Sequence, residues 1–202
     1  MKFIKQLAAV AAVLSAAPAF AASPVTLDFE GTSSFASIAE YYNGGTDSAG
    51  VSGTNDGVSF GLSALSLSND VLGPYYSNAP SSNGVMFVAD AADASLTYNA
   101  GFTNLSFYYA ASSDAVLNIY AAEGSLIKTL TLAANTDATY STWSLVNVSL
   151  AGVGTKIDLS GSVGSVAYDN ITISAVPEAS SYAMVLAGLG VVGMVARRRK
   201  QA

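Results

Sequence analysis

Two carboxylates near the start of the chain are the first residues whose spacing could support catalysis. Asp28 and Glu30 lie two positions apart in an alternating segment, so both side chains point to one face of a strand. A glycosidase needs two carboxyl groups about 5–10 Å apart in a cleft. No nucleophile elbow or phosphate loop accompanies the pair. We therefore predict no catalytic residue and no enzyme, with a carboxylate-based glycan-processing enzyme as the second alternative.

The composition excludes several other classes of site. The 202 residues include no His and no Cys, which removes Ser-His-Asp and Cys-His catalysis, imidazole and thiolate metal sites, and disulfides. Acidic residues number 14 against 8 Lys and Arg, giving a formal net charge of −6. Because phosphate backbones attract basic surfaces, we expect no nucleic-acid partner.

Tyrosines supply a possible binding chemistry. Adjacent tyrosine pairs begin at Tyr41, Tyr75 and Tyr108. On a strand one member of such a pair points outward, where the ring can stack on a sugar. Tyr75 and Tyr76 follow a Gly-Pro step and should lie in a loop, which makes them the best exposed ligand-binding candidates. The alternative interpretation is that the tyrosines fill the rims of a core.

Alternating apolar and polar residues predict the elements that must position these groups. The segment from residue 23 to residue 175 contains about ten alternating runs separated by Gly, Asn, Asp and Ser, without a helical period or an internal repeat. Short strands at this spacing predict an all-β fold, a jelly-roll-like β-sandwich. The runs are 25–30, 57–67, 84–88, 94–98, 104–109, 115–120, 126–132, 142–150, 156–159 and 165–174.

The N-terminus reads as a signal peptide over residues 1–22. Lys2 and Lys5 precede an apolar stretch, and small residues at Ala19 and Ala21 form the cleavage pattern, with Ala22 or Ser23 starting the mature chain. We therefore expect export through the secretion translocon and cleavage by signal peptidase.

Residues 176–202 at the C-terminus are predicted to be a second targeting signal. An apolar segment predicts a short transmembrane helix over residues 182–196, followed by a basic stop cluster. The positive-inside rule puts both chain ends in the cytoplasm and the segment between them outside. The cluster consists of Arg197, Arg198, Arg199 and Lys200.

This tail resembles the PEP-CTERM sorting signal of exosortase-processed bacterial proteins, in which a Pro-Glu-Pro-type motif, a short helix and an Arg-rich end follow in order. The second proline of that motif is replaced here by Ala179. The resemblance implies transient anchoring in the inner membrane, with the domain in the periplasm, then processing by an exosortase-type enzyme. Release to the cell surface or extracellular matrix would follow. The corresponding residues are Val176, Pro177, Glu178 and Ala179.

The segments 27–30 and 167–173 resemble the closing strands of carbohydrate-binding-module-like jelly rolls. In those modules a Glu after the first strand and an Asp on the last strand often share a structural calcium ion. The resemblance implies that Glu30 and Asp169 bind Ca²⁺, with help from loop carbonyls and from Asp47 or Asp56. Calcium takes six to eight oxygen ligands, which this oxygen-rich chain can supply. Capping or solvated carboxylates are the alternative.

The Tyr42-Asn-Gly-Gly, Gly57-Val-Ser-Phe and Asp169-Asn-Ile-Thr segments also resemble, in this order, a recurrent class of exported PEP-CTERM proteins. Ser, Thr, Ala and Gly dominate the chain, charged residues make up 11% of it, and its ends direct it outside the cell. On these grounds we predict a non-enzymatic surface or extracellular-matrix protein associated with exopolysaccharide. The first alternative is a calcium-stabilised carbohydrate-binding module.

Overall fold

Strands form where apolar and polar residues alternate, because each strand buries one face and exposes the other. The computed structural model describes residues 23–70, 73–175 and 188–189, and residues 23–176 form one compact unit. The strands of these residues are β1 (Val25–Leu27), β2 (Val58–Phe60), β3 (Ala64–Leu67), β4 (Val85–Val88), β5 (Ser95–Ala111), β6 (Ala115–Tyr120), β7 (Leu126–Leu132), β8 (Ser144–Gly161) and β9 (Val166–Ala175). The predicted all-β sandwich is confirmed.

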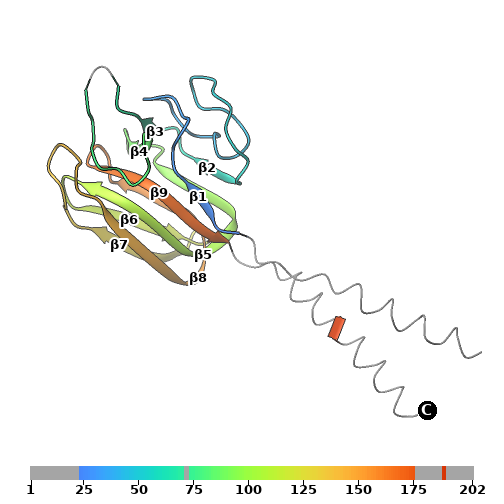
Figure 1. Ribbon diagram of the computed structural model, residues 1–202. Coiled ribbons are helices and arrows are strands. Elements are labelled where there is room, and N and C mark those ends of the chain that lie inside the picture. The colour runs from blue at the N-terminus through green and yellow to red at the C-terminus, as the bar shows by residue number, and fades with distance from the viewer. Residues whose placement is uncertain (1–22, 71–72, 176–187, 190–202) are drawn as a thin grey trace, which may run out of the picture. The chain divides into compact units, whose positions relative to one another are not determined.

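All strand pairs named here are antiparallel. Hydrogen bonds connect the strands in the order β3-β4-β9-β5-β8-β6-β7, with β1 also paired to β9 and β2 to β5. The long strands β5 and β8 run through both layers of the sandwich, so one hydrogen-bonded sheet folds over on itself (Figure 1). The first and last strands lie side by side, as a calcium ion shared by Glu30 and Asp169 would require, with Val25 opposite Ile173.

The long strands correct the predicted strand count. The runs 94–98 and 104–109 are one strand, β5, because pairing continues through register shifts between Thr97 and Phe102 and between Phe102 and Asn104. A bulge adds a residue, so the buried positions along β5 change from even to odd residue numbers. In the sequence, this change looks like the end of one strand and the start of another. The runs 142–150 and 156–159 merge into β8 in the same way, whereas 57–67 divides into β2 and β3.

The core lies between the two inner faces of the sheet. Tyr168, Phe29 and Phe102 are its largest fully buried side chains. Tyr41 and Tyr42 are both buried in this core, so the expectation that one of them points outward is wrong. The reason is that residues 41–42 lie in a turn rather than on a strand, and the two rings meet edge to face 5.0 Å apart.

The two predicted targeting signals lie largely outside the described residues. These are the signal peptide with Ala19, Ala21 and Ala22, the motif at residues 176–179, the basic cluster at residues 197–200, and the 182–196 helix except for Gly188 and Leu189, which are helical. Within the part of the chain that the structure describes, no helix is long and apolar enough to cross a membrane.

Candidate functional site

The loop between β3 and β4 carries Tyr75 and Tyr76 and is fixed by side-chain hydrogen bonds. Asn69 Oδ1 accepts from the backbone N–H of Tyr75 at 2.9 Å and of Tyr76 at 3.3 Å, while Asn69 Nδ2 donates to Tyr76 O at 3.0 Å. The amide of Asn69 thus forms hydrogen bonds with the loop backbone that a neighbouring strand would supply in a sheet. The two tyrosines are therefore held in place.

A second segment, between β7 and β8, braces the same loop. Trp143 Nε1 donates to Ser77 O at 2.9 Å, and Asn78 Nδ2 donates to Ser141 O at 3.2 Å. The Trp143 ring also packs edge to face against Tyr76, with centroids 6.4 Å apart. Two loops that are far apart in the sequence are therefore joined into one continuous surface.

An aromatic groove of about 430 Å³ opens between these loops. Phe35 meets Tyr75 edge to face with centroids 5.4 Å apart, and it meets Phe87 of β4 at 6.2 Å. We use the name aromatic groove for the lining formed by Phe35, Leu67, Pro74, Tyr75, Tyr76, Phe87, Ala138, Tyr140, Gly164, Val166 and Ala167.

Two aromatic residues of the groove have strained backbones. Phe35 has φ of 60° and Tyr140 has φ of 45°, in the left-handed region that bulky residues rarely adopt. The Phe35 side chain is nevertheless 51% exposed, so burial of the ring does not offset the strain. Strained residues of this kind gather at binding sites, where the surrounding structure holds them in a set orientation.

The predicted ligand-binding tyrosines differ in their exposure. Tyr75 is partly exposed, and its hydroxyl donates to Asp70 Oδ1 at 3.4 Å. Burial and the charge of Asp70 raise its pKa, which keeps the hydroxyl protonated. Tyr76 is only 3% exposed, so the expectation of an exposed ring is wrong for this residue. Its ring packs edge to face against Trp143 and lines the floor of the groove instead.

Asp169 anchors the far end of the same loop. Its Oδ2 accepts from Ser81 N at 2.7 Å, and its Oδ1 accepts from Asn170 N at 2.7 Å. Ser81 Oγ lies 2.8 Å from Asp169 Oδ1, 3.0 Å from Gly84 O and 3.2 Å from Asp28 O. A hydroxyl has one proton, so these three acceptors share a single donor.

Glu30 binds the next turn of this loop. Its Oε1 accepts from Asn83 N at 2.7 Å and from Gly84 N at 3.0 Å. Burial raises the pKa of Asp169 above its ordinary value, although hydrogen bonds from Ser81 and Asn170 oppose the shift, and the negative charge of Glu30 raises it further. The structure thus brings Glu30 and Asp169 to one short segment, residues 81–84.

The other two predicted calcium ligands lie elsewhere. Asp47 is 2% exposed and accepts backbone hydrogen bonds from Ser33, Ala49 and Val51. Asp56 accepts from the Thr54 hydroxyl. Among the described residues, no three acidic side chains form a group that could hold a metal ion. Any cation at Glu30 and Asp169 would therefore be completed by uncharged oxygens.

Sequence reasoning missed Phe35, Tyr140 and Trp143 as members or supports of the site. Phe35 and Tyr140 lie in loops outside the alternating runs, whereas Trp143 falls in the predicted run 142–150 but precedes β8 in the structure. Phe35 is also more than 100 residues from the other two in the chain. A glycine or asparagine in the sequence usually signals a backbone with positive φ, and Phe35 and Tyr140 adopt positive φ without that signal.

Comparison with known proteins identifies the tail. Residues 175–200 match the PEP-CTERM protein-sorting motif, which marks exported proteins. No curated protein matches the sequence.

Several solved structures are similar to part of this chain. CBM35 from Paenibacillus barcinonensis is 23% identical with a TM-score of 0.39, over 59% of this chain and 94% of that one. CsCBM6-3 from Clostridium stercorarium, solved with cellobiose, is 18% identical with a TM-score of 0.34, over 54% and 88%. A family 43 arabinoxylan arabinofuranohydrolase from Bacillus subtilis, in complex with cellotetraose, is 14% identical with a TM-score of 0.40. The match covers 58% of this chain and only 26% of that enzyme. Likeness at this level assigns no function to the chain.

Proposed function

Because residues 175–200 are a PEP-CTERM sorting motif, we propose that this protein is delivered to the cell surface or extracellular matrix and binds exopolysaccharide there. The secretion translocon and signal peptidase would act on residues 1–22. An exosortase-type enzyme would then process the chain near Pro177 and Glu178, after transient anchoring in the inner membrane.

The aromatic groove is the observation that carries the binding function. Sugar rings present C–H faces that pack on aromatic rings, and hydroxyls at their edges that hydrogen-bond to polar groups. Phe35 and Tyr75 offer partly exposed rings that are already held in position. The groove therefore suits a saccharide chain, and little ordering of the protein would oppose binding.

The lining of the groove favours binding over catalysis. Glycoside hydrolysis needs two carboxyl groups that flank the bond to be cleaved. The residues that line the groove include no Asp and no Glu. We therefore propose a non-enzymatic role.

Calcium stabilisation is a second proposal, and one observation favours it. The Tyr76 hydroxyl is buried without a hydrogen-bond partner, and the charges of Glu30 and Asp169 add to the effect of burial in raising its pKa. The carbonyl oxygens of Asp28 and Gly84 lie beside the Ser81 hydroxyl that also contacts Asp169. Glu30 and Asp169 would hold the ion, which would neutralise their charges and fix the loop.

Binding is tested with the domain of residues 23–175, whose core is formed within these residues. Its retention on immobilised cellulose, xylan, dextran and alginate is measured beside Phe35→Ala and Tyr75→Ala. Loss of one stacking ring should weaken retention by roughly tenfold or more.

Tyr108→Ala is the matched control, because Tyr108 is a partly buried tyrosine of β5 outside the groove lining. It should bind as the unaltered domain does. Equal losses in all three variants, or no retention of the unaltered domain on any polysaccharide, would reject the groove as the binding site.

A further inference from the structure

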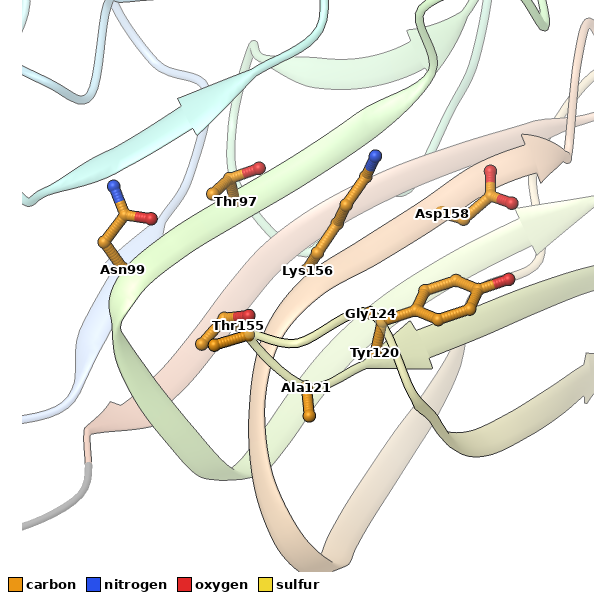
Figure 2. Close-up of a pocket in the computed structure, with 9 residues that line it drawn as sticks. Thr97, Asn99, Tyr120, Ala121, Gly124, Thr155, Lys156 and Asp158 are labelled. Atoms are coloured by element: carbon orange, nitrogen blue, oxygen red, sulfur yellow. The ribbon is translucent and has the colours of Figure 1, made fainter.

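A second hollow lies on the outer face of the sheet, away from the aromatic groove. It has a volume of about 510 Å³, and strands β5, β6 and β8 supply most of its walls. Figure 2 shows Lys156 extending between Thr97 and Asp158, with the ring of Tyr120 on the neighbouring strand. No residue lines both this hollow and the groove.

Strand register explains why these side chains meet. Lys156 pairs with Thr97 of β5 on one side and with Tyr120 of β6 on the other, so the three form one row across the sheet. Asp158 lies two residues further along β8 and therefore points to the same face. The intervening Ile157 is buried in the core. The row is fixed by backbone pairing rather than by a loop.

Most polar side chains that line this hollow have no hydrogen-bond partner among the described residues. Within the described residues, the side chains of Thr97, Asn99, Tyr120 and Lys156 make no hydrogen bond and no ion pair. Asp158 accepts one hydrogen bond, from Ser160 N at 2.9 Å. By contrast, Asn69, Asn78 and Asn135 all fasten loops.

From this arrangement we infer that the hollow is a second saccharide site, for an uncharged glycan. Lys156 donates hydrogen bonds only, Asp158 accepts only, and Asn99 does both, so together they match a run of sugar hydroxyls. The Tyr120 ring provides an apolar surface for the C–H face.

Charge determines the class of glycan. Lys156 is one of two Lys or Arg residues between residue 28 and residue 178, a stretch that contains all 14 acidic residues. Asp158 offsets its charge inside the hollow. A polyuronate would be repelled by the acidic domain, whereas a neutral glucan would not be.

Two separate sites on one domain would let it bridge two polysaccharide chains. Linked sites also raise the apparent affinity for a long polymer without any new contact. This inference extends the proposed function but does not depend on the groove, because the hollow shares no residue with it.

The test is isothermal titration of the 23–175 domain with cellohexaose and maltohexaose, and gel retardation in hydroxyethylcellulose, dextran and alginate. We expect two sites per domain on at least one neutral probe and no retardation by alginate. Lys156→Ala should remove one site or weaken it about tenfold, since a hydrogen bond from a charged group is lost. Lys128→Ala is the matched control, an exposed lysine of β7 outside the hollow.

Each result distinguishes the two sites. If Tyr75→Ala leaves one site and Lys156→Ala leaves one site, both proposals hold. If Lys156→Ala and Tyr120→Ala both bind as Lys128→Ala does, the second site is rejected while the groove stands. If Lys156→Ala abolishes binding and Tyr75→Ala does not, the groove is rejected while the hollow stands. Retention on alginate that Lys156→Ala abolishes, or no binding to any neutral probe, would overturn the inference.

Discussion

Ser81 and Asp169, 88 residues apart in the chain, are joined by two hydrogen bonds. The backbone N–H of Ser81 donates to Oδ2 of Asp169 at 2.7 Å, and its hydroxyl donates to Oδ1 at 2.8 Å. The pair fastens the loop that carries Tyr75 to strand β9. The geometry of the groove therefore depends on a carboxylate that does not line it.

Calcium should stabilise the domain, and more at neutral than at acid pH. The raised pKa of Asp169, caused first by burial, means that its contribution to stability is complete at low pH and is lost as pH rises through the folded-state pKa. A bound cation would stabilise the ionised carboxylate and so offset this loss of stability. Calcium at about 100 times its Kd should raise the Tm by roughly 5–10 °C at pH 7, measured by scanning calorimetry against chelator.

Glu30→Gln and Asp169→Asn should each abolish the calcium effect, whereas Asp56→Asn should not, because Asp56 contacts Thr54 instead. Identical Tm values with calcium and with chelator would show that the carboxylates act as hydrogen-bond anchors alone.

Gly84→Ala should destabilise the domain strongly. A Cβ atom at residue 84 would lie 2.1 Å from the carbonyl oxygen of Phe29, too close for any rotamer change to relieve. We expect a loss of about 2–4 kcal/mol in the free energy of unfolding, measured by urea denaturation. Gly152→Ala is the control, since a Cβ there meets no atom within 4 Å. Equal stability of the two variants would contradict the structure.

Asp47→Asn should destabilise the domain at neutral pH more than at acid pH. Burial alone would raise the pKa of Asp47, but hydrogen bonds from Ser33, Val51 and Ala49 outweigh it, so the folded-state pKa is lowered. Its contribution is therefore complete above the unfolded pKa of about 3.9 and is lost as pH falls through the lower folded value.

Urea denaturation should show a cost of about 1.5–3 kcal/mol for Asp47→Asn at pH 7, and a smaller cost near pH 2.5. The exposed Asp90→Asn is the control and should change stability by less than about 0.5 kcal/mol. A cost that does not vary with pH would refute the assigned role of the carboxylate.

Trp143 should report occupancy of the groove. It is the single tryptophan of the chain, and its ring packs on Tyr76, the floor of the groove. A saccharide that binds there would change the environment of the indole and hence its fluorescence emission. Titration of the unaltered domain with a retained polysaccharide should shift the emission, and titration of Tyr75→Ala should not. A bound ligand without any change in emission would place binding elsewhere.

The sequence predicts the strands well because alternation reports burial directly. The resemblance of segments 27–30 and 167–173 to the closing strands of carbohydrate-binding modules also implies that the first and last strands are neighbours, and Val25 does pair with Ile173. The sequence cannot predict that β5 and β8 continue through bulges, because a bulge interrupts the alternation of apolar and polar residues in the same way as the end of a strand. The positions of Phe35 and Trp143 are set by long-range packing of loops, which no local period records.

Strand β9 connects the aromatic groove to the sorting tail and so sets the direction of a force that acts between them. Val166 and Ala167, at its beginning, line the aromatic groove, and its last residue, Ala175, adjoins the sorting tail. With a polysaccharide held in the groove and the tail held at the membrane, tension would run along β9, parallel to the strand. Strand β9 would then shear against its partners β1, β4 and β5 rather than unzip from them, so that many ladder hydrogen bonds would have to break together. The fold would thus resist pulling in the direction in which a moving matrix would pull it.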